Sequence, residues 1–226
     1  MESPARSGVR MLLLLVAILF APGANAQGLS PDALVRAVSS DVISSIRDDR
    51  ELQAGNQRKL IELVTRAILP HVDAPRMTRL ALGAAWRQAT PTQQQKLTLE
   101  FTALLIHTYS GALAAYRDRA MIVGPLRAGA DETEVAVRSQ IRQAGAPPIA
   151  VDFFMARTQS GWKVYDVKID GVSLVSTYRA TFSEEVRNRG IEGLIDLLSA
   201  RNREHGRRID TLTGPPATGR GRTSQA

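Results

Sequence analysis

The chain has 226 residues, of which 44% are apolar, and a formal net charge of +7 with an isoelectric point near 10.3. This length supports one sizeable hydrophobic core, so we expect one globular domain with appendages rather than two domains. The chain contains no cysteine, which excludes disulfide bonds and any metal site with cysteine ligands.

Residues 1–26 have the pattern of a secretory signal peptide. Arg6 and Arg10 precede an unbroken apolar run from Met11 to Phe20, and small residues stand at positions 24 and 26. The apolar run is about half as long as the roughly 20 residues that span a bilayer as a helix. We therefore expect an exported mature protein that begins near Gln27.

Four helical segments are expected next. Ser30 and Pro31 have the residue types of an N-cap and a first helical position. A second helix is predicted at 57–69, where it stops before Pro70, and a third at 76–88. Thr90 and Gln93 form a T-x-x-Q capping box with a proline between them. This specific start signal predicts the longest helix, which extends to about residue 112.

Four runs of β-type composition follow, at 120–126, 132–141, 149–157 and 162–169. Short connections that contain glycine or proline separate them, which favours an antiparallel meander over crossover units. Helices return at 174–189 and 191–201, with Gly190 as a C-terminal cap of the first. The order predicts an α+β fold with an antiparallel sheet of about four strands between N-terminal and C-terminal helices.

The strand at 162–169 and the helix after it are the most strongly patterned part of the chain. Strict alternation would place Tyr165, Val167 and Ile169 on one face of the strand. The same alternation would place Trp162, Val164 and Asp166 on the other. After a turn at 170–171, apolar residues recur every fourth position: Leu174, Tyr178, Phe182 and Val186. A strand that folds directly onto a helix with this much apolar surface suggests that an apolar ligand is held there.

The positive charge is concentrated at the C-terminal end. Residues 201–226 contain six arginines against Glu204 and Asp210, so that only about +2 of the charge falls on residues 27–200. Glycines, prolines and low apolar content predict that residues 203–226 form a basic disordered tail. Its arginines would attract an anionic membrane surface weakly. Nucleic-acid binding is disfavoured by the near-neutral body and the export signal.

Catalytic and metal-binding motifs are scarce, and we expect no catalytic residues, no metal and no cofactor. The sequence lacks H-E-x-x-H, G-x-S-x-G and G-x-G-x-x-G. His107 is expected to be a core or pocket-edge residue, and Ser173 to cap the following helix. Asp166 is the strongest candidate for a general base, which leaves a small α+β enzyme as an alternative. The competing interpretation is that Asp166 forms an ion pair or hydrogen bonds that organise the sheet.

Three segments carry a family resemblance over about residues 30–202. They are LGAAWRQATPTQQQKLTLEFTALLIHTYSGALAAY from Leu82, GWKVYDVKIDGVSLVSTYRATF from Gly161 and GIEGLIDLLSARN from Gly190. Together they resemble the MlaC family of periplasmic phospholipid-binding proteins, also known as the toluene-tolerance family. The resemblance divides the chain into a signal peptide (1–26), an MlaC-like lipid-binding domain (27–202) and the tail (203–226).

The resemblance implies a periplasmic lipid carrier that is not an enzyme, whose α+β fold encloses an apolar pocket for acyl chains. Its partners would be an outer-membrane lipoprotein–porin complex and the MCE-domain subunit of an inner-membrane ABC transporter. A branch of the family is associated with hopanoid synthesis, so a polycyclic lipid is the alternative cargo. The candidate lipid-binding residues are Phe101, Leu105, Tyr109, Val151, Phe153, Tyr165, Val167, Ile169, Val172, Leu174 and Tyr178.

Overall fold

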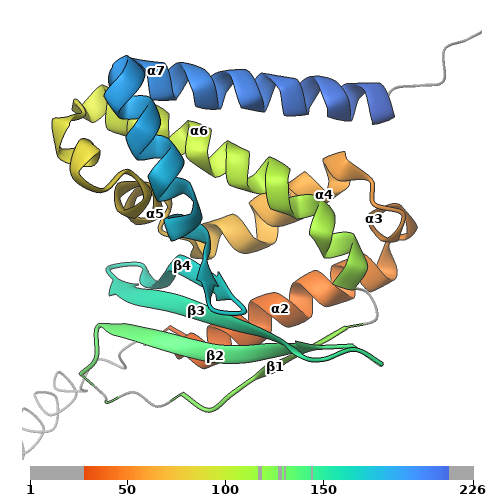
Figure 1. Cartoon of the computed structure of the whole chain (residues 1–226). Coiled ribbons are helices and arrows are strands. Elements are labelled where there is room, and N and C mark those ends of the chain that lie inside the picture. Colours follow the sequence, from red (N-terminus) through yellow and green to blue (C-terminus); the bar gives the residue numbers. More distant parts are fainter. Residues whose placement is uncertain (1–27, 117–118, 127–128, 130, 144, 214–226) are drawn as a thin grey trace, which may run out of the picture.

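A computed structural model describes residues 28–213, apart from 117–118, 127–128, 130 and 144. The predicted signal peptide and residues 214–226 lie outside this range. Helices, strands and helices follow one another along the chain, as predicted, and Figure 1 shows the helices gathered on one side of the sheet. The α+β prediction is therefore confirmed. None of the helices in the described range has the length and apolar character to cross a membrane.

The first, second and longest N-terminal helices begin at the predicted positions, and α5 begins two residues before the predicted residue 76. Thr90 and Gln93 form the complete capping box at the start of α6. Ser30 holds the N-cap position of α2 without capping it, because its hydroxyl donates to Asp32 instead. The α-helices are α2 (Pro31–Asp48), α3 (Arg50–Gln53), α4 (Gln57–Leu63), α5 (Ala74–Leu82) and α6 (Pro91–Tyr109). A π-helix η1 (Val64–Ile68) and the 3₁₀-helices η2 (Leu69–His71), η3 (Gly83–Gln88) and η4 (Ser110–Tyr116) extend them.

The strands form one antiparallel sheet in chain order, which confirms the predicted meander. They are β1 (Ala120–Val123), β2 (Glu134–Arg142), β3 (Ile149–Thr158), β4 (Gly161–Ile169) and a short β5 (Val172–Ser173) that the sequence analysis did not predict. Side chains of β2 alternate strictly between exposed and buried, which is typical of a sheet with one covered face. Val135 and Val137 point to that face and pack with Val35 of α2.

A β-bulge in β4 overturns the predicted alternation of its side chains. Met155 pairs with Val164 and Phe154 pairs with Asp166, so Tyr165 is an extra residue with no partner in β3. An extra residue shifts the alternation by one position. Val164 and Val167 therefore point to the same, helix-covered face of the sheet, and Tyr165 points away from Val167.

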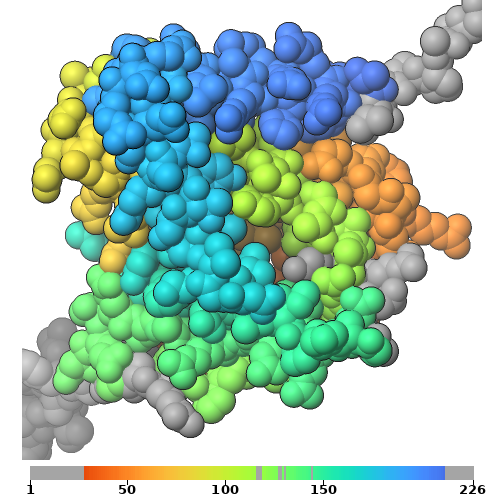
Figure 2. All heavy atoms as spheres, viewed as in Figure 1, coloured from red at the N-terminus to blue at the C-terminus, as the bar shows by residue number. Residues whose placement is uncertain are grey.

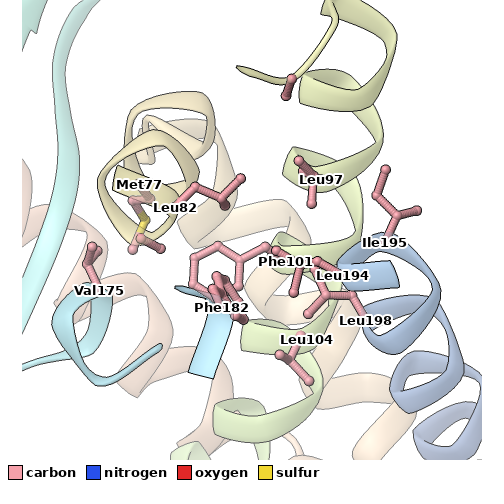
Figure 3. Packing of buried hydrophobic residues seen from close by; sticks show 12 residues of the cluster. Met77, Leu82, Leu97, Phe101, Leu104, Val175, Phe182, Leu194, Ile195 and Leu198 are labelled. Atoms are coloured by element: carbon pink, nitrogen blue, oxygen red, sulfur yellow. The ribbon is translucent and has the colours of Figure 1, made fainter. Parts of the chain in front are cut away.

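The main core lies between α5, α6 and α7 (Leu174–Thr213). Phe101 packs edge-to-face against Phe182 and Tyr178, with 5.1 Å between ring centroids in both pairs. Figure 3 shows Phe101 and Phe182 facing each other, with Leu104 and Leu198 close by. Two smaller clusters lie against α2. The one around Ile46 joins it to α3 and α4, and the one around Met155 joins it to the sheet.

The C-terminal helix α7 is bent at Gly190, where the backbone has φ 72°. This break confirms the predicted boundary, and it allows the second half of the helix to cross over α6 (Figure 1). Helix α7 then continues to Thr213, so the prediction of disorder is wrong for residues 203–213. Ile209 is buried, and Asp210 forms an ion pair with Arg58 of α4 at 3.1 Å. These contacts hold the last turns of α7 against the rest of the fold.

Candidate functional site

An apolar cavity of about 200 Å³ lies between the sheet and the helices that cover it. Figure 2 shows the surface hollowed between α6 and the first turns of α7, above the sheet. The cavity is lined by Val64, Ile68, Leu69, Val72, Ala74, Met77, Thr78, Phe101, Thr102, Leu105, Ile106, Tyr109, Ser110, Leu113, Val167 and Leu174. No charged side chain is among them, so the cavity suits a hydrocarbon ligand.

Irregular helical segments form a large part of the cavity wall. The π-helix η1 contributes Val64 and Ile68, and the 3₁₀-helix η4 contributes Leu113. These segments replace the i→i+4 hydrogen bonds of an α-helix by i→i+5 or i→i+3 bonds, and π-helical turns are frequent at functional sites. The regular helix α6 supplies the opposite wall with residues three and four positions apart, which share one face.

Five of the predicted lipid-binding residues line the cavity together. They are Phe101, Leu105 and Tyr109 on α6, Val167 on β4 and Leu174 at the start of α7. Phe101 also belongs to the main core, where 1% of its surface remains exposed. Phe101 therefore belongs to the core and to the cavity wall at once. The sequence pattern does not distinguish these two roles.

Three other predicted residues lie at the edge of the cavity. Ile169 and Val172 pair with each other in the hairpin that joins β4 to β5, next to Val167 and Leu174, and their side chains are 38% and 63% exposed. The Tyr178 ring packs against Phe101. These residues do not line the cavity, but each lies next to a residue that does.

The remaining three predicted residues point elsewhere. Val151 is buried in β3 beside Ser139, and Phe153 packs with the cluster around Met155. Tyr165 lies on the outer side of the bulge, where its hydroxyl donates to Glu134 at 3.1 Å and its ring stacks under the Arg76 guanidinium at 3.7 Å. The bulge reverses the side of Tyr165 alone, whereas Val151 and Phe153 keep the face of Val167 but do not line the cavity.

Much of the cavity wall was not among the predicted binding residues. Val64 and Ile68 belong to the helix predicted at 57–69, and no residue of that helix is among the predicted binding residues. Val72, Met77 and Leu113 carried no signal that separates a cavity wall from ordinary packing. The change of helical pitch at η1 turns these side chains toward a common space, and only the folded chain shows it.

Two tyrosines interact beside the cavity, Tyr109 of α6 and Tyr178 of α7. Burial of the ring, followed by interaction with the Tyr109 hydroxyl, raises the pKa of Tyr178 to about 12. The hydroxyl of Thr108 and the charge of Arg201 act on Tyr178 in the opposite direction. Tyr178 therefore stays neutral and connects the apolar cavity with polar groups on α6 and α7.

Asp166 caps the start of α7 and does not line the cavity. Its Oδ1 accepts from the backbone N–H groups of Val167 at 2.9 Å and Val175 at 3.2 Å, and its Oδ2 accepts from the Ser173 hydroxyl at 2.6 Å. Ser173 in turn accepts from the N–H of Ser176, which confirms its predicted capping role. The hydrogen-bonding interpretation of Asp166 is confirmed.

The Asp166→Ala variant is expected to lose about 1–3 kcal/mol of unfolding free energy, because it leaves buried donors of the α7 start unpaired. Urea unfolding followed by circular dichroism measures this loss. Asp152→Ala, on the outer side of the same sheet, is the matched control and should change stability by less than about 0.5 kcal/mol. Equal losses in the two variants would contradict the capping role.

A second, polar cleft of about 520 Å³ lies at the end of α6. It is lined by Glu51, Ala54, Gly55, Asn56, Gln57, His107, Thr108, Gly111, His205, Arg208 and Ile209. The imidazole rings of His107 and His205 stack in parallel, 5.7 Å apart. His107 was predicted to be a core or pocket-edge residue, and the structure places it at the edge of a cleft. The described residues offer no cluster of three or more ligands that suits a metal ion.

Mild acid is expected to destabilise the protein through His107. Burial, and then the nearby His205, lower the pKa of His107 below its ordinary value of 6.5. Between that lowered pKa and 6.5 the unfolded chain binds a proton that the folded chain does not, so this contribution is full above 6.5 and is lost as pH falls. His107→Asn should therefore flatten the decrease of Tm between pH 7.5 and 5.5. An unchanged pH profile would contradict this assignment.

Comparison with known proteins agrees with this architecture. The chain matches the MlaC protein family over residues 36–200. It is 22% identical to the toluene tolerance protein Ttg2D of Pseudomonas putida, over 78% of this chain and 82% of that protein. It is 26% identical to the intermembrane phospholipid transport system binding protein MlaC of Haemophilus influenzae, over 74% of this chain and 79% of that protein.

A solved structure is also similar. The phospholipid-binding protein from Ralstonia solanacearum, in complex with a phospholipid, superposes with a TM-score of 0.73 at 40% identity, over 79% of this chain and 99% of that chain. The sequence match covers most of the described residues, including α6, the sheet and the first half of α7. The chain therefore belongs to the MlaC family.

Proposed function

We propose that the protein is a periplasmic phospholipid carrier that holds acyl chains in the apolar cavity between α6, η1, β4 and α7. The observation that carries the proposal is an uncharged cavity, lined by hydrocarbon side chains, in a chain 40% identical to a protein solved with a phospholipid. The carrier role needs no catalytic group, and the one candidate base, Asp166, is engaged in capping α7.

The physical need for a carrier follows from the hydrophobic effect. Two acyl chains with roughly 30 methylenes between them cost on the order of 25 kcal/mol to expose to water, at about 0.8 kcal/mol each. A lipid that crosses an aqueous compartment must have its chains covered. Binding free energy saturates well below this sum, so the protein can also release its cargo when a membrane or a partner accepts the chains.

The cavity must widen to take a complete lipid. Its volume of about 200 Å³ is smaller than the roughly 300–1,000 Å³ of ordinary small-molecule pockets. The irregular segments η1, η2 and η4 are the parts of the wall with the fewest regular helical hydrogen bonds, so we assign the widening to them. The regular helix α6 would form the wall that remains fixed.

In the cell, this carrier would collect lipid at one membrane and deliver it to the other in an Mla-type pathway. Its partners would be an outer-membrane lipoprotein–porin complex and the MCE-domain subunit of an inner-membrane ABC transporter. Ile169 and Val172, exposed beside the cavity, offer an apolar surface on which the acyl chains can pass to such a partner without full exposure to water.

Native mass spectrometry of the mature protein, purified from its own periplasm without detergent, tests the proposal. We expect about one co-purifying phospholipid per chain, identified after lipid extraction. A polycyclic lipid in its place would assign the protein to the hopanoid branch of the family. A protein that stays empty, and that also takes up no lipid from vesicles, would refute the carrier role.

A further inference from the structure

The end of α7 builds a part of the polar cleft that the family match does not include. That match ends at residue 200, whereas His205, Arg208 and Ile209 line the cleft. Buried Ile209 and the Arg58–Asp210 ion pair fix these turns to the body. Part of the cleft wall thus comes from residues beyond the matched range.

Several polar groups of the cleft are already engaged. Glu51 accepts from Lys59 at 3.1 Å and from Asn56 at 2.9 Å, which neutralises the one acidic side chain of the lining. Gln57 donates to Ser110 at 2.7 Å. Within the described residues, Arg208 takes part in no ion pair. The buried Nδ1 of His107 has no hydrogen-bond partner there.

The Arg208 guanidinium is a cation with five N–H donors, so the cleft suits an anion. A guanidinium, two imidazoles and the Thr108 hydroxyl line the same space, and guanidinium groups bind phosphate oxygens with matched geometry. Arg201 extends the positive side: it stands seven residues before Arg208 on α7, which is close to two helical turns, so the two guanidinium groups emerge on one side of the helix.

The cleft and the apolar cavity share one turn of α6. Tyr109 and Ser110 line the cavity, and their neighbours Thr108 and Gly111 line the cleft. The Gln57–Ser110 hydrogen bond joins the two walls directly. One helical turn advances only about 5.4 Å, so the two spaces lie within about one turn of each other along α6.

We propose that this cleft, with Arg208 and Arg201, binds the phosphate of an anionic lipid headgroup whose acyl chains occupy the apolar cavity. The ligand class is a glycerophospholipid with a net negative headgroup, such as phosphatidylglycerol. This inference rests on the proposed carrier function. It adds a headgroup preference that the cavity alone cannot provide, because hydrocarbon walls do not distinguish headgroups.

Lipid uptake from mixed vesicles tests the preference. The mature, delipidated protein is incubated with phosphatidylcholine vesicles that contain equal amounts of phosphatidylglycerol and phosphatidylethanolamine, and bound lipid is quantified by mass spectrometry. We expect phosphatidylglycerol to be enriched about threefold over phosphatidylethanolamine, the size of a partly exposed charge interaction. The enrichment should disappear in Arg201→Ala/Arg208→Ala, because the phosphate loses both guanidinium partners.

Arg207→Ala, compared with single Arg208→Ala, is the matched control, because both variants remove one positive charge from the same turn but Arg207 does not line the cleft. Only Arg208→Ala should lower the enrichment. Thermal unfolding confirms that both variants remain folded.

Three results would overturn the inference. The first is equal enrichment in wild type and in the Arg201/Arg208 double variant while lipid is still bound, which leaves the carrier function intact. The second is inorganic phosphate that binds in calorimetry in an Arg208-dependent way without any headgroup preference, which identifies a site for a free anion. The third, no uptake of any lipid by the wild type, would refute the proposed function itself.

Discussion

The Leu174→Trp variant is expected to remain folded and to lose its bound lipid. Leu174 is half-buried and its side chain lines the apolar cavity, so the larger indole fills empty space in the lipid-free protein. Lipid must then displace the indole, and overpacking of this kind costs about 1–3 kcal/mol. This cost falls on the lipid-bound state and corresponds to an affinity loss of about 5- to 150-fold.

Val151→Trp is the matched control for this experiment. Val151 is 4% exposed and does not line the cavity, so the same substitution meets packed side chains and should lower the free energy of unfolding by about 1–3 kcal/mol. Urea unfolding and lipid mass spectrometry on both variants give the comparison. A Leu174→Trp protein that unfolds as readily as Val151→Trp would show that position 174 is ordinary core.

The Phe101→Ala variant is expected to be the most destabilised of the single substitutions considered, by about 3–5 kcal/mol. Phe101 is 1% exposed and packs edge-to-face with both Tyr178 and Phe182. Each such aromatic pair contributes roughly 0.5–1.5 kcal/mol beyond the buried area. In a chain of this length the loss should lower Tm by on the order of 10 °C.

Phe154→Ala provides the control for Phe101→Ala. Phe154 lies on the outer face of the sheet, half-buried, with the Lys168 ammonium 4.7 Å from its ring centre. Its removal should cost roughly 1 kcal/mol, the scale of an exposed cation–π contact. Calorimetry of the two variants decides the point, and similar Tm values would contradict the central position of Phe101 in the core.

The capping signals and the apolar periodicity predicted most of the fold. The T-x-x-Q box at Thr90 and the glycine at position 190 act through their own backbone neighbours, so local sequence is sufficient to place them. The connection between β3 and β4 has only two residues, which requires an antiparallel pair. The β-bulge at Tyr165 was not predicted, because a bulge depends on how β4 pairs with β3. The apolar pattern of each strand does not contain the register between the two.

The family resemblance, the α+β order and five of the cavity residues could be predicted from the sequence. For α6 the reason is that its apolar positions recur with helical periodicity. Only the tertiary structure decided which buried side chains enclose space and which fill it. It also decided that residues 203–213 continue α7, because their order comes from contacts with α4 and α6, such as Arg58–Asp210 and His107–His205, that join distant parts of the chain. Burial is a local property of a side chain, whereas a cavity is the shape left between several elements, and that shape exists only once they pack.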